Sequence, residues 1–132
     1  MNYMSVEEIL EFEKELDELV SRCESGAVVV VEGAKDRKCL ITLGVRGRIV
    51  EASSRPADDV AEEVCRFSRD VLIFTDADRR GISLAEKLLK AFECRGVIPD
   101  IKISRKMLSL CRVKSVESMA IRYYSSLEAT RF

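Results

Sequence analysis

Residues 27–33, AVVVVEG, decide the fold class of this chain. An uninterrupted β-branched run of this kind is typical of a strand covered on both faces, as parallel strands in α/β proteins are. Residues 71–77, VLIFTDA, have the same character, and shorter strands are expected in residues 47–53 and 97–104. Helical patterns alternate with these segments. The sequence therefore predicts an α/β fold with about four mostly parallel strands, connected by right-handed crossovers and flanked by helices.

The predicted helices set the domain organisation. An amphipathic helix is expected at the N-terminus, with Ser5 as its N-cap, Glu8 completing a capping box and Gly26 ending it. Further helices are expected between the strands, and one or two terminal helices are expected at the C-terminus with a break near residues 113–115. We expect a single domain overall: an N-terminal helix (1–25) packed on a core (26–104), followed by a C-terminal helical extension (105–132).

The amino-acid composition argues against some classes of protein. The chain has 132 residues, of which 47% are hydrophobic and 34% charged, as in a soluble globular protein. No run approaches the roughly 18 apolar residues of a membrane span, and the N-terminus is acidic, unlike a signal peptide, so we expect a cytoplasmic protein without a membrane partner. The five cysteines are scattered and there is no histidine, which argues against zinc and predicts reduced, mostly buried thiols. Catalysis would have to use carboxylates, lysine, arginine or a metal.

Acidic residues follow two of the predicted strands. Glu32 ends the valine run, and Asp76 and Asp78 end the run VLIFT. If the chain stays extended, Asp76 and Asp78 point the same way, and a divalent cation such as Mg²⁺ would relieve their repulsion. The structural alternatives are a capping or salt-bridged Glu32 and an N-cap role for Asp76 or Asp78. Gly33 and Gly81 are expected to let the backbone approach closely.

Two motifs in this order, VVVVEGAKD and IFTDADRRG, resemble the Toprim domain. This family includes bacterial-type primases, type IA and type II topoisomerases, OLD-family nucleases and the small ribonuclease that matures 5S ribosomal RNA. The resemblance covers roughly residues 26–104. It implies a compact four-stranded fold, Mg²⁺ (with Mn²⁺ as a substitute) at the acidic cluster, and phosphoryl transfer or phosphodiester cleavage. It also implies that Asp76 and Asp78 hold the metal and that Glu32 is a general acid or base, or a metal ligand.

Charged residues just beyond the acids suggest how a phosphate would be held. The candidates for binding a phosphate are Lys35, Arg37, Arg79 and Arg80, and Asp36 is expected to have a structural role at the site. Their alternative role is as exposed charges in the first turns of two helices. Residues 95–132 carry eight basic and three acidic side chains, whereas residues 1–25 carry eight acidic and two basic ones. This asymmetry favours a nucleic-acid partner, pairing of the two segments within one subunit or between the subunits of a homo-oligomer, or simply solvated helix faces.

Three functions remain open from the sequence. The first is an Mg²⁺-dependent nuclease acting on RNA or DNA, and the second is a module that binds metal and nucleic acid, or a partner protein, without cleaving. A haloacid-dehalogenase-type phosphatase is less favoured, because its nucleophile motif normally lies on the first strand and ends in Gly-Thr, where this chain has Arg79 and Arg80. The tyrosines have no context that suggests a nucleophile, and Glu117 is expected to be a solvated glutamate.

Overall fold

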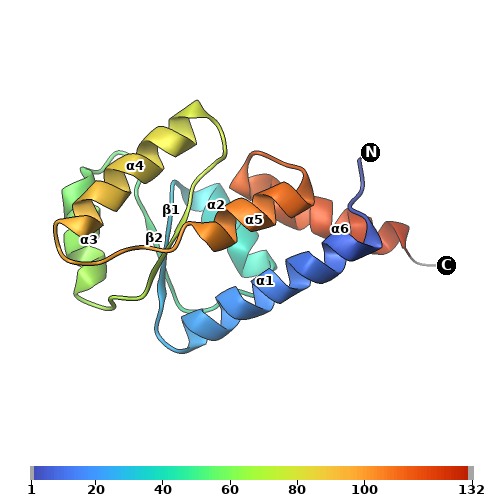
Figure 1. The fold of residues 1–132 in the computed structure, drawn as a ribbon, viewed down its shortest axis with the longest axis horizontal. Helices are drawn as coiled ribbons and strands as arrows, with labels where there is room; N and C mark the ends of the chain where they lie inside the picture. The colour runs from blue at the N-terminus through green and yellow to red at the C-terminus, as the bar shows by residue number, and fades with distance from the viewer. Residues whose placement is uncertain (1, 131–132) are drawn as a thin grey trace.

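A three-stranded parallel sheet forms the centre of the molecule (Figure 1). The structure is a computed structural model, and it describes residues 2–130. The strands are β1 (Val28–Val31), β2 (Arg48–Glu51) and β3 (Val71–Phe74), in the order β2-β1-β3. All residues of β1 and β3 are buried, as the apolar runs predicted. The α/β class and the parallel pairing are confirmed.

The prediction of a fourth strand in residues 97–104 is wrong. Only a single bridge forms there, between Asp100 and Leu72, and α5 (Lys102–Cys111) begins two residues later. Pro99 has no N–H to contribute to a ladder. The carboxylate of Asp100 accepts hydrogen bonds from the amides of Lys102 and Ile103 at 2.8 and 3.2 Å, and this capping starts a helix where a strand would have continued.

Helices cover both faces of the sheet and separate its apolar residues into two cores (Figure 1). On one face, Val29 and Val31 of β1 lie in one core with buried residues of α1 (Val6–Glu24), α2 (Ala34–Thr42), α5 and α6 (Met119–Ala129). On the other face, Val28 and Val30 contact α3 (Ala57–Cys65) and α4 (Arg79–Glu93). This alternation follows from the two-residue period of a strand.

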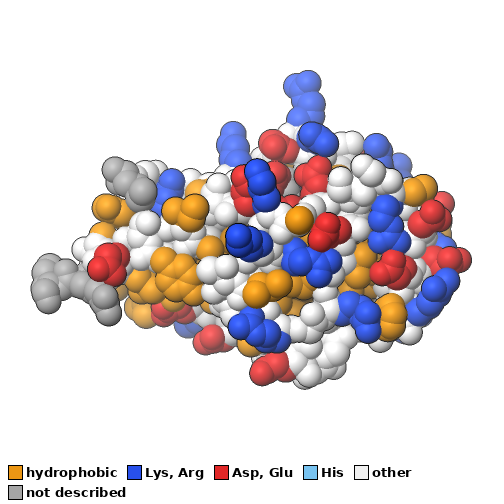
Figure 2. Space-filling view, turned by 180° about the vertical axis from the view of Figure 1, so that it is seen from behind, with side chains coloured by type: hydrophobic (Ala, Val, Ile, Leu, Met, Phe, Trp, Pro, Cys, Tyr) orange, Lys and Arg blue, Asp and Glu red, His pale blue; other side chains and the backbone are white. Residues whose placement is uncertain are grey.

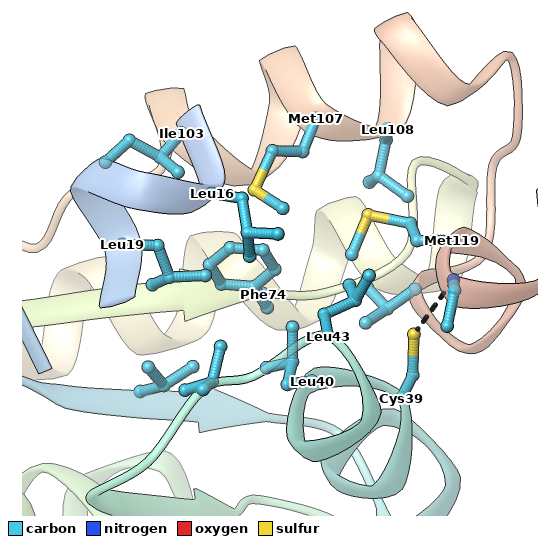
Figure 3. Packing of buried hydrophobic residues seen from close by; sticks show 14 of the residues in the cluster. Leu16, Leu19, Cys39, Leu40, Leu43, Phe74, Ile103, Met107, Leu108 and Met119 are labelled. Atoms are coloured by element: carbon cyan, nitrogen blue, oxygen red, sulfur yellow. Dashed lines mark hydrogen bonds between the residues drawn. The ribbon is translucent and has the colours of Figure 1, made fainter. Parts of the chain in front are cut away.

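The first core joins the two ends of the chain. Phe12, Leu16 and Leu19 of α1 are buried, and α1 packs mainly against α5. Figure 3 shows Leu16 and Leu19 pointing toward Phe74 and Met107, with Leu40 of α2 below them. The predicted capping box is present, since Ser5 and Glu8 exchange side-chain and backbone hydrogen bonds. The N-terminal amphipathic helix is thus confirmed.

The chain after α5 has the predicted break. Arg112 adopts a left-handed conformation with φ of 59° and ends α5, and a short 3₁₀ helix, η1 (Val116–Ser118), precedes α6. Three of the five free cysteines are buried, and Cys94 is exposed. Searching residues 2–130 for a helix with the length and apolar character of a membrane span finds none.

Candidate functional site at the carboxyl edge of the sheet

Glu32 stands directly after the central strand. Its side chain is about one quarter exposed, and its Oε2 lies 3.5 Å from an Nη atom of Arg80, whose own side chain is 87% exposed. The Glu32 carbonyl accepts a hydrogen bond of 2.9 Å from the amide of Ser53, which holds the loop after β2 against the end of β1. The predicted salt-bridge alternative is therefore present, as a long and solvent-exposed pair that contributes little stability.

Asp76 is held by the C-terminal part of the chain. Its Oδ1 accepts a 2.8 Å hydrogen bond from the amide of Val116, and the neighbouring Ala77 amide donates to the carbonyl of Lys114 at 2.7 Å. Residues 114–116, which we call the clamp, thus lie alongside the end of β3. The sequence marked this region only as a break between helices, because nothing local to it signals a contact some 40 residues away.

Asp78 has the N-cap role that the sequence left open. Its Oδ1 accepts a 2.8 Å hydrogen bond from the amide of Gly81 and begins α4. The close approach predicted at Gly81 is also found, since a Cβ there would lie 2.0 Å from the carbonyl oxygen of Asp76. At Gly33 the same prediction is wrong: its backbone is extended, and an added Cβ would meet nothing within 4 Å.

The pKa of Asp36 reflects its burial and the negative charge at the carboxyl edge of the sheet. It is buried in the first turn of α2, where its Oδ2 accepts a 3.1 Å hydrogen bond from the amide of Gly33. Burial raises the pKa of Asp36, and the negative charges of Asp76, Glu32 and Glu117 raise it further against the opposing hydrogen bond. Glu117 is exposed, as predicted, yet η1 brings its charge into the same neighbourhood. Four carboxylates therefore share one region around the ends of β1 and β3.

Arg105 is a further charged residue that the sequence did not single out. It extends from α5 and donates hydrogen bonds to the carbonyl and the hydroxyl of Thr75, at 2.8 and 3.2 Å. Burial lowers the pKa of Arg105, although the negative charges of Asp76 and Asp78 oppose this shift. The sequence placed Arg105 at the start of the helical extension, but no local pattern signals that it anchors the end of β3 about 30 residues earlier.

The carboxylates are not arranged as a ready metal site. Across residues 2–130, no three acidic or cysteine side chains lie so that they could hold one ion. The cause is visible in their contacts, because Asp76 and Asp78 each use one oxygen for a backbone amide and Glu32 faces Arg80. Each carboxylate still has a second oxygen outside those contacts. The donor set itself, hard oxygens only, is one that suits Mg²⁺.

The predicted phosphate-binding residues separate into two groups. Arg79 and Arg80 line a hollow of about 740 Å³ together with Glu32. Arg37 is instead paired with Glu51, with 2.8 Å between Nε and Oε2, and Lys35 is exposed on α2. Figure 2, in which the carboxyl edge of the sheet is uppermost, shows acidic side chains gathered there among protruding lysines and arginines.

Fold and site together define a small parallel α/β protein with an acidic carboxyl edge bordered by arginines. No family model matches the chain. It is 36% identical over 122 residues to a UPF0292 protein of Archaeoglobus fulgidus, covering 89% of this chain and 94% of that one. It is also 36% identical over 116 residues to a UPF0292 protein of Methanosarcina barkeri, covering 86% and 79% of the two chains. The chain belongs to the UPF0292 family.

A solved structure extends the comparison to the fold. A protein from Aquifex aeolicus superposes with a TM-score of 0.70 at 22% sequence identity, over 80% of this chain and 95% of that one. At this identity the likeness concerns the fold alone. It supports a Rossmann-like arrangement of the sheet and its helices.

Proposed function

We propose that this protein binds Mg²⁺ at the carboxyl edge of its sheet and cleaves phosphodiester bonds in RNA or DNA, as a small member of the Toprim group that its two motifs resemble. The observation that carries the proposal is that the negative charges of Glu32, Asp76 and Glu117 lie near the buried Asp36 and add to the rise that burial causes in its pKa. Like charges gathered at the carboxyl ends of parallel strands, where ligands of open α/β sheets bind, favour a cation as the partner.

Glu32, Asp76 and Asp78 are the residues that would hold the metal. The second oxygens of Asp76 and Asp78 lie outside their hydrogen bonds to Val116 and Gly81. Those bonds would keep the two side chains oriented while the other oxygens face the ion. When bound, Mg²⁺ (or Mn²⁺ in its place) neutralises charge on the non-bridging phosphate oxygens.

Glu32 is the residue that we expect to move a proton at the attacking or leaving oxygen. The chain has no histidine, so a carboxylate at this edge is the candidate acid–base group. Within residues 2–130, the ionic contact of Glu32 is the 3.5 Å approach of Arg80, which is solvent-exposed and would exchange readily for a phosphate oxygen. Arg79 and Arg80 would then hold the phosphate beside it.

A non-catalytic binding module is the second candidate, and a specific observation favours it. Asp76 and Asp78 each have a structural role that needs no metal, one fixing the clamp and the other capping α4. In that case the acidic edge would hold a cation and the basic residues would hold nucleic acid without cleavage.

One assay separates the two candidates. Labelled structured RNA, single-stranded DNA and duplex DNA are incubated with purified protein and Mg²⁺, Mn²⁺ or chelator. We expect metal-dependent cleavage that falls at least about 100-fold in Glu32→Gln, the usual range for loss of an acid–base group. The control is Glu86→Gln, which removes an exposed acid on α4 that does not line the hollow. Salt-sensitive binding without cleavage would establish the module, and neither binding nor cleavage would reject both candidates.

A further inference from the structure

We infer that the hollow beside Glu32 is the track of the phosphodiester backbone of a single nucleic-acid strand, which runs from the acidic edge over α4 and not over α2. The inference rests on the proposed function and adds the side from which the substrate reaches Glu32. The hollow, which we call the α3–α4 hollow, lies between the loop that precedes α3 and the first turns of α4. Its volume, about 740 Å³, suits a short length of one strand.

The charge of the α3–α4 hollow favours an anion. Four basic side chains line it, Arg55, Arg79, Arg80 and Lys87, against the single acid Glu32. Among the described residues, neither Arg79 nor Lys87 has a hydrogen bond or an ion pair through its side chain, and Arg80 has only its long contact to Glu32. Three of the four cations are thus available to phosphate oxygens.

The position of these cations on α4 is unfavourable without a ligand. Arg79 and Arg80 occupy the first turn, where the helix dipole disfavours positive charge, and that turn contains no acidic residue. Lys87 lies two turns further along the same helix and lines the same hollow. A row of phosphates passing along α4 would meet these side chains in succession.

The wall of the α3–α4 hollow opposite α4 is the loop that precedes α3, and this loop is hydrogen-bonded to the acidic edge. Ser53 donates its amide to the carbonyl of Glu32, and Ser54 follows in a left-handed conformation with φ of 60°. Arg55 is held by Glu63, with 2.6 Å between Nη2 and Oε1, so its guanidinium borders the hollow in a defined place. The loop therefore places two hydroxyl groups and one positive charge across from α4.

The α2 side offers less to a phosphate backbone. Arg37 is paired with Glu51 and does not line the α3–α4 hollow, which leaves Lys35 as the exposed cation of the first motif. Asp36 and Glu117 add negative charge on this side. Electrostatics thus direct the strand toward α4.

The test measures the salt dependence of binding. The probes are fluorescein-labelled 12-nucleotide oligothymidylate and oligouridylate, with chelator present to prevent cleavage, and fluorescence anisotropy is followed over a range of salt concentrations. Each lost phosphate contact to a single strand lowers the slope of log K against log salt by about 0.7. We expect Lys87→Ala and Arg79→Ala each to reduce the slope by about that amount and to weaken binding several-fold.

Lys90→Ala is the matched control. It removes the same charge from an exposed position on the same helix, but Lys90 does not line the α3–α4 hollow. Its slope should equal that of the unaltered protein. If Lys87→Ala and Arg79→Ala keep the full slope while Lys35→Ala lowers it, the strand lies over α2; the inference is then overturned and the proposed function stands.

Two further outcomes would also overturn the inference. Uridine monophosphate that binds as tightly as the oligonucleotide, and loses affinity in Lys87→Ala, would make the hollow a nucleotide site. Absence of oligonucleotide binding at low salt would overturn the inference as well, and the proposed function would then be judged by the cleavage assay on structured RNA and duplex DNA.

Discussion

The backbone around Gly81 leaves no room for a side chain. The first turn of α4 passes so close to the end of β3 that a Cβ at position 81 would lie 2.0 Å from the carbonyl oxygen of Asp76, and 2.7 and 2.8 Å from its carbonyl carbon and amide nitrogen. These are backbone atoms, which cannot turn away as a flexible side chain can. The absence of a side chain at Gly81 therefore lets the amide of residue 81 reach Asp78.

Gly81→Ala should destabilise the fold and displace Asp76 together with it. We expect a loss of about 1–3 kcal/mol in the free energy of unfolding, the range for overpacking in a dense region. Urea denaturation followed by circular dichroism measures it. Gly33→Ala is the comparison, because its added Cβ meets nothing within 4 Å and its backbone is extended. Equal losses in the two variants would contradict the steric argument.

At the residue scale, the sequence predicts contacts between residues that are close along the chain and misses contacts between residues that are far apart along it. The capping of α4 by Asp78 and the tight approach at Gly81 follow from a strand running into a helix within a few residues. Arg105 and the clamp reach the end of β3 from about 30 and 40 residues away, and no short pattern encodes such contacts. The functional roles of Glu32 and Asp76 stay predictions.

At the element scale, Asp100 decides between strand and helix. Its amide and carbonyl still bond to β3, donating to Val71 at 2.7 Å and accepting from Ile73 at 2.9 Å, but its side chain caps α5. The same carboxylate receives Arg22 of α1, with 2.6 Å between Nη1 and Oδ2. Residues 97–104 have a strand-like composition, yet the side chain of Asp100 starts a helix there by accepting hydrogen bonds from two backbone amides, and it accepts a further one from Arg22. The alternation of apolar residues that predicts a strand carries no information on such side-chain bonds.

The loss of stability in Asp100→Asn should depend on pH. Burial raises the pKa of Asp100, but hydrogen bonds from Arg22 and from the amides of Ile103 and Lys102 outweigh it, and the pKa lies below its ordinary value. A lowered pKa means that the ionised group stabilises the fold above the ordinary value, near 3.9, and that this contribution is lost as pH falls through the lower, folded-state pKa.

The variant should therefore be less stable at pH 7, by at most about 1 kcal/mol because solvent screens the pair. The difference from the unaltered protein should shrink as pH falls below about 4. Thermal unfolding at several pH values measures both effects. Glu18→Gln, at an exposed position of α1, should show neither. A stability difference that does not vary with pH would refute the assigned role of the charge.

At the scale of the whole molecule, the core depends on both ends of the chain. The alternation of strands and helices sufficed to predict the fold class, since it reflects local periodicity. It did not reveal that α1 and α6 meet, which they do where Phe12 packs on Tyr123 with 4.9 Å between ring centroids. The segment predicted as the core, residues 26–104, would by itself leave one face of the sheet without the cover of α1 and α6.

Phe12→Ala should therefore destabilise the entire protein and not only its first helix. We expect a loss of about 3–5 kcal/mol in the free energy of unfolding, the usual cost of removing a buried phenyl ring. Leu10→Ala, on the exposed side of α1, should cost less than about 1 kcal/mol. Chemical denaturation monitored at a probe in α4 checks the claim, because a loss confined to α1 would leave that transition unchanged.

The clamp couples the acidic edge to the rest of the C-terminal third. Asp76 and Ala77 are bonded to residues 116 and 114, which lead directly into η1 and α6. By thermodynamic linkage, a ligand that displaced the Val116 amide from the Oδ1 of Asp76 would weaken the docking of η1 and α6. Binding at the edge of the sheet and the position of the terminal helices would therefore depend on each other, although these helices contribute no strand to the sheet.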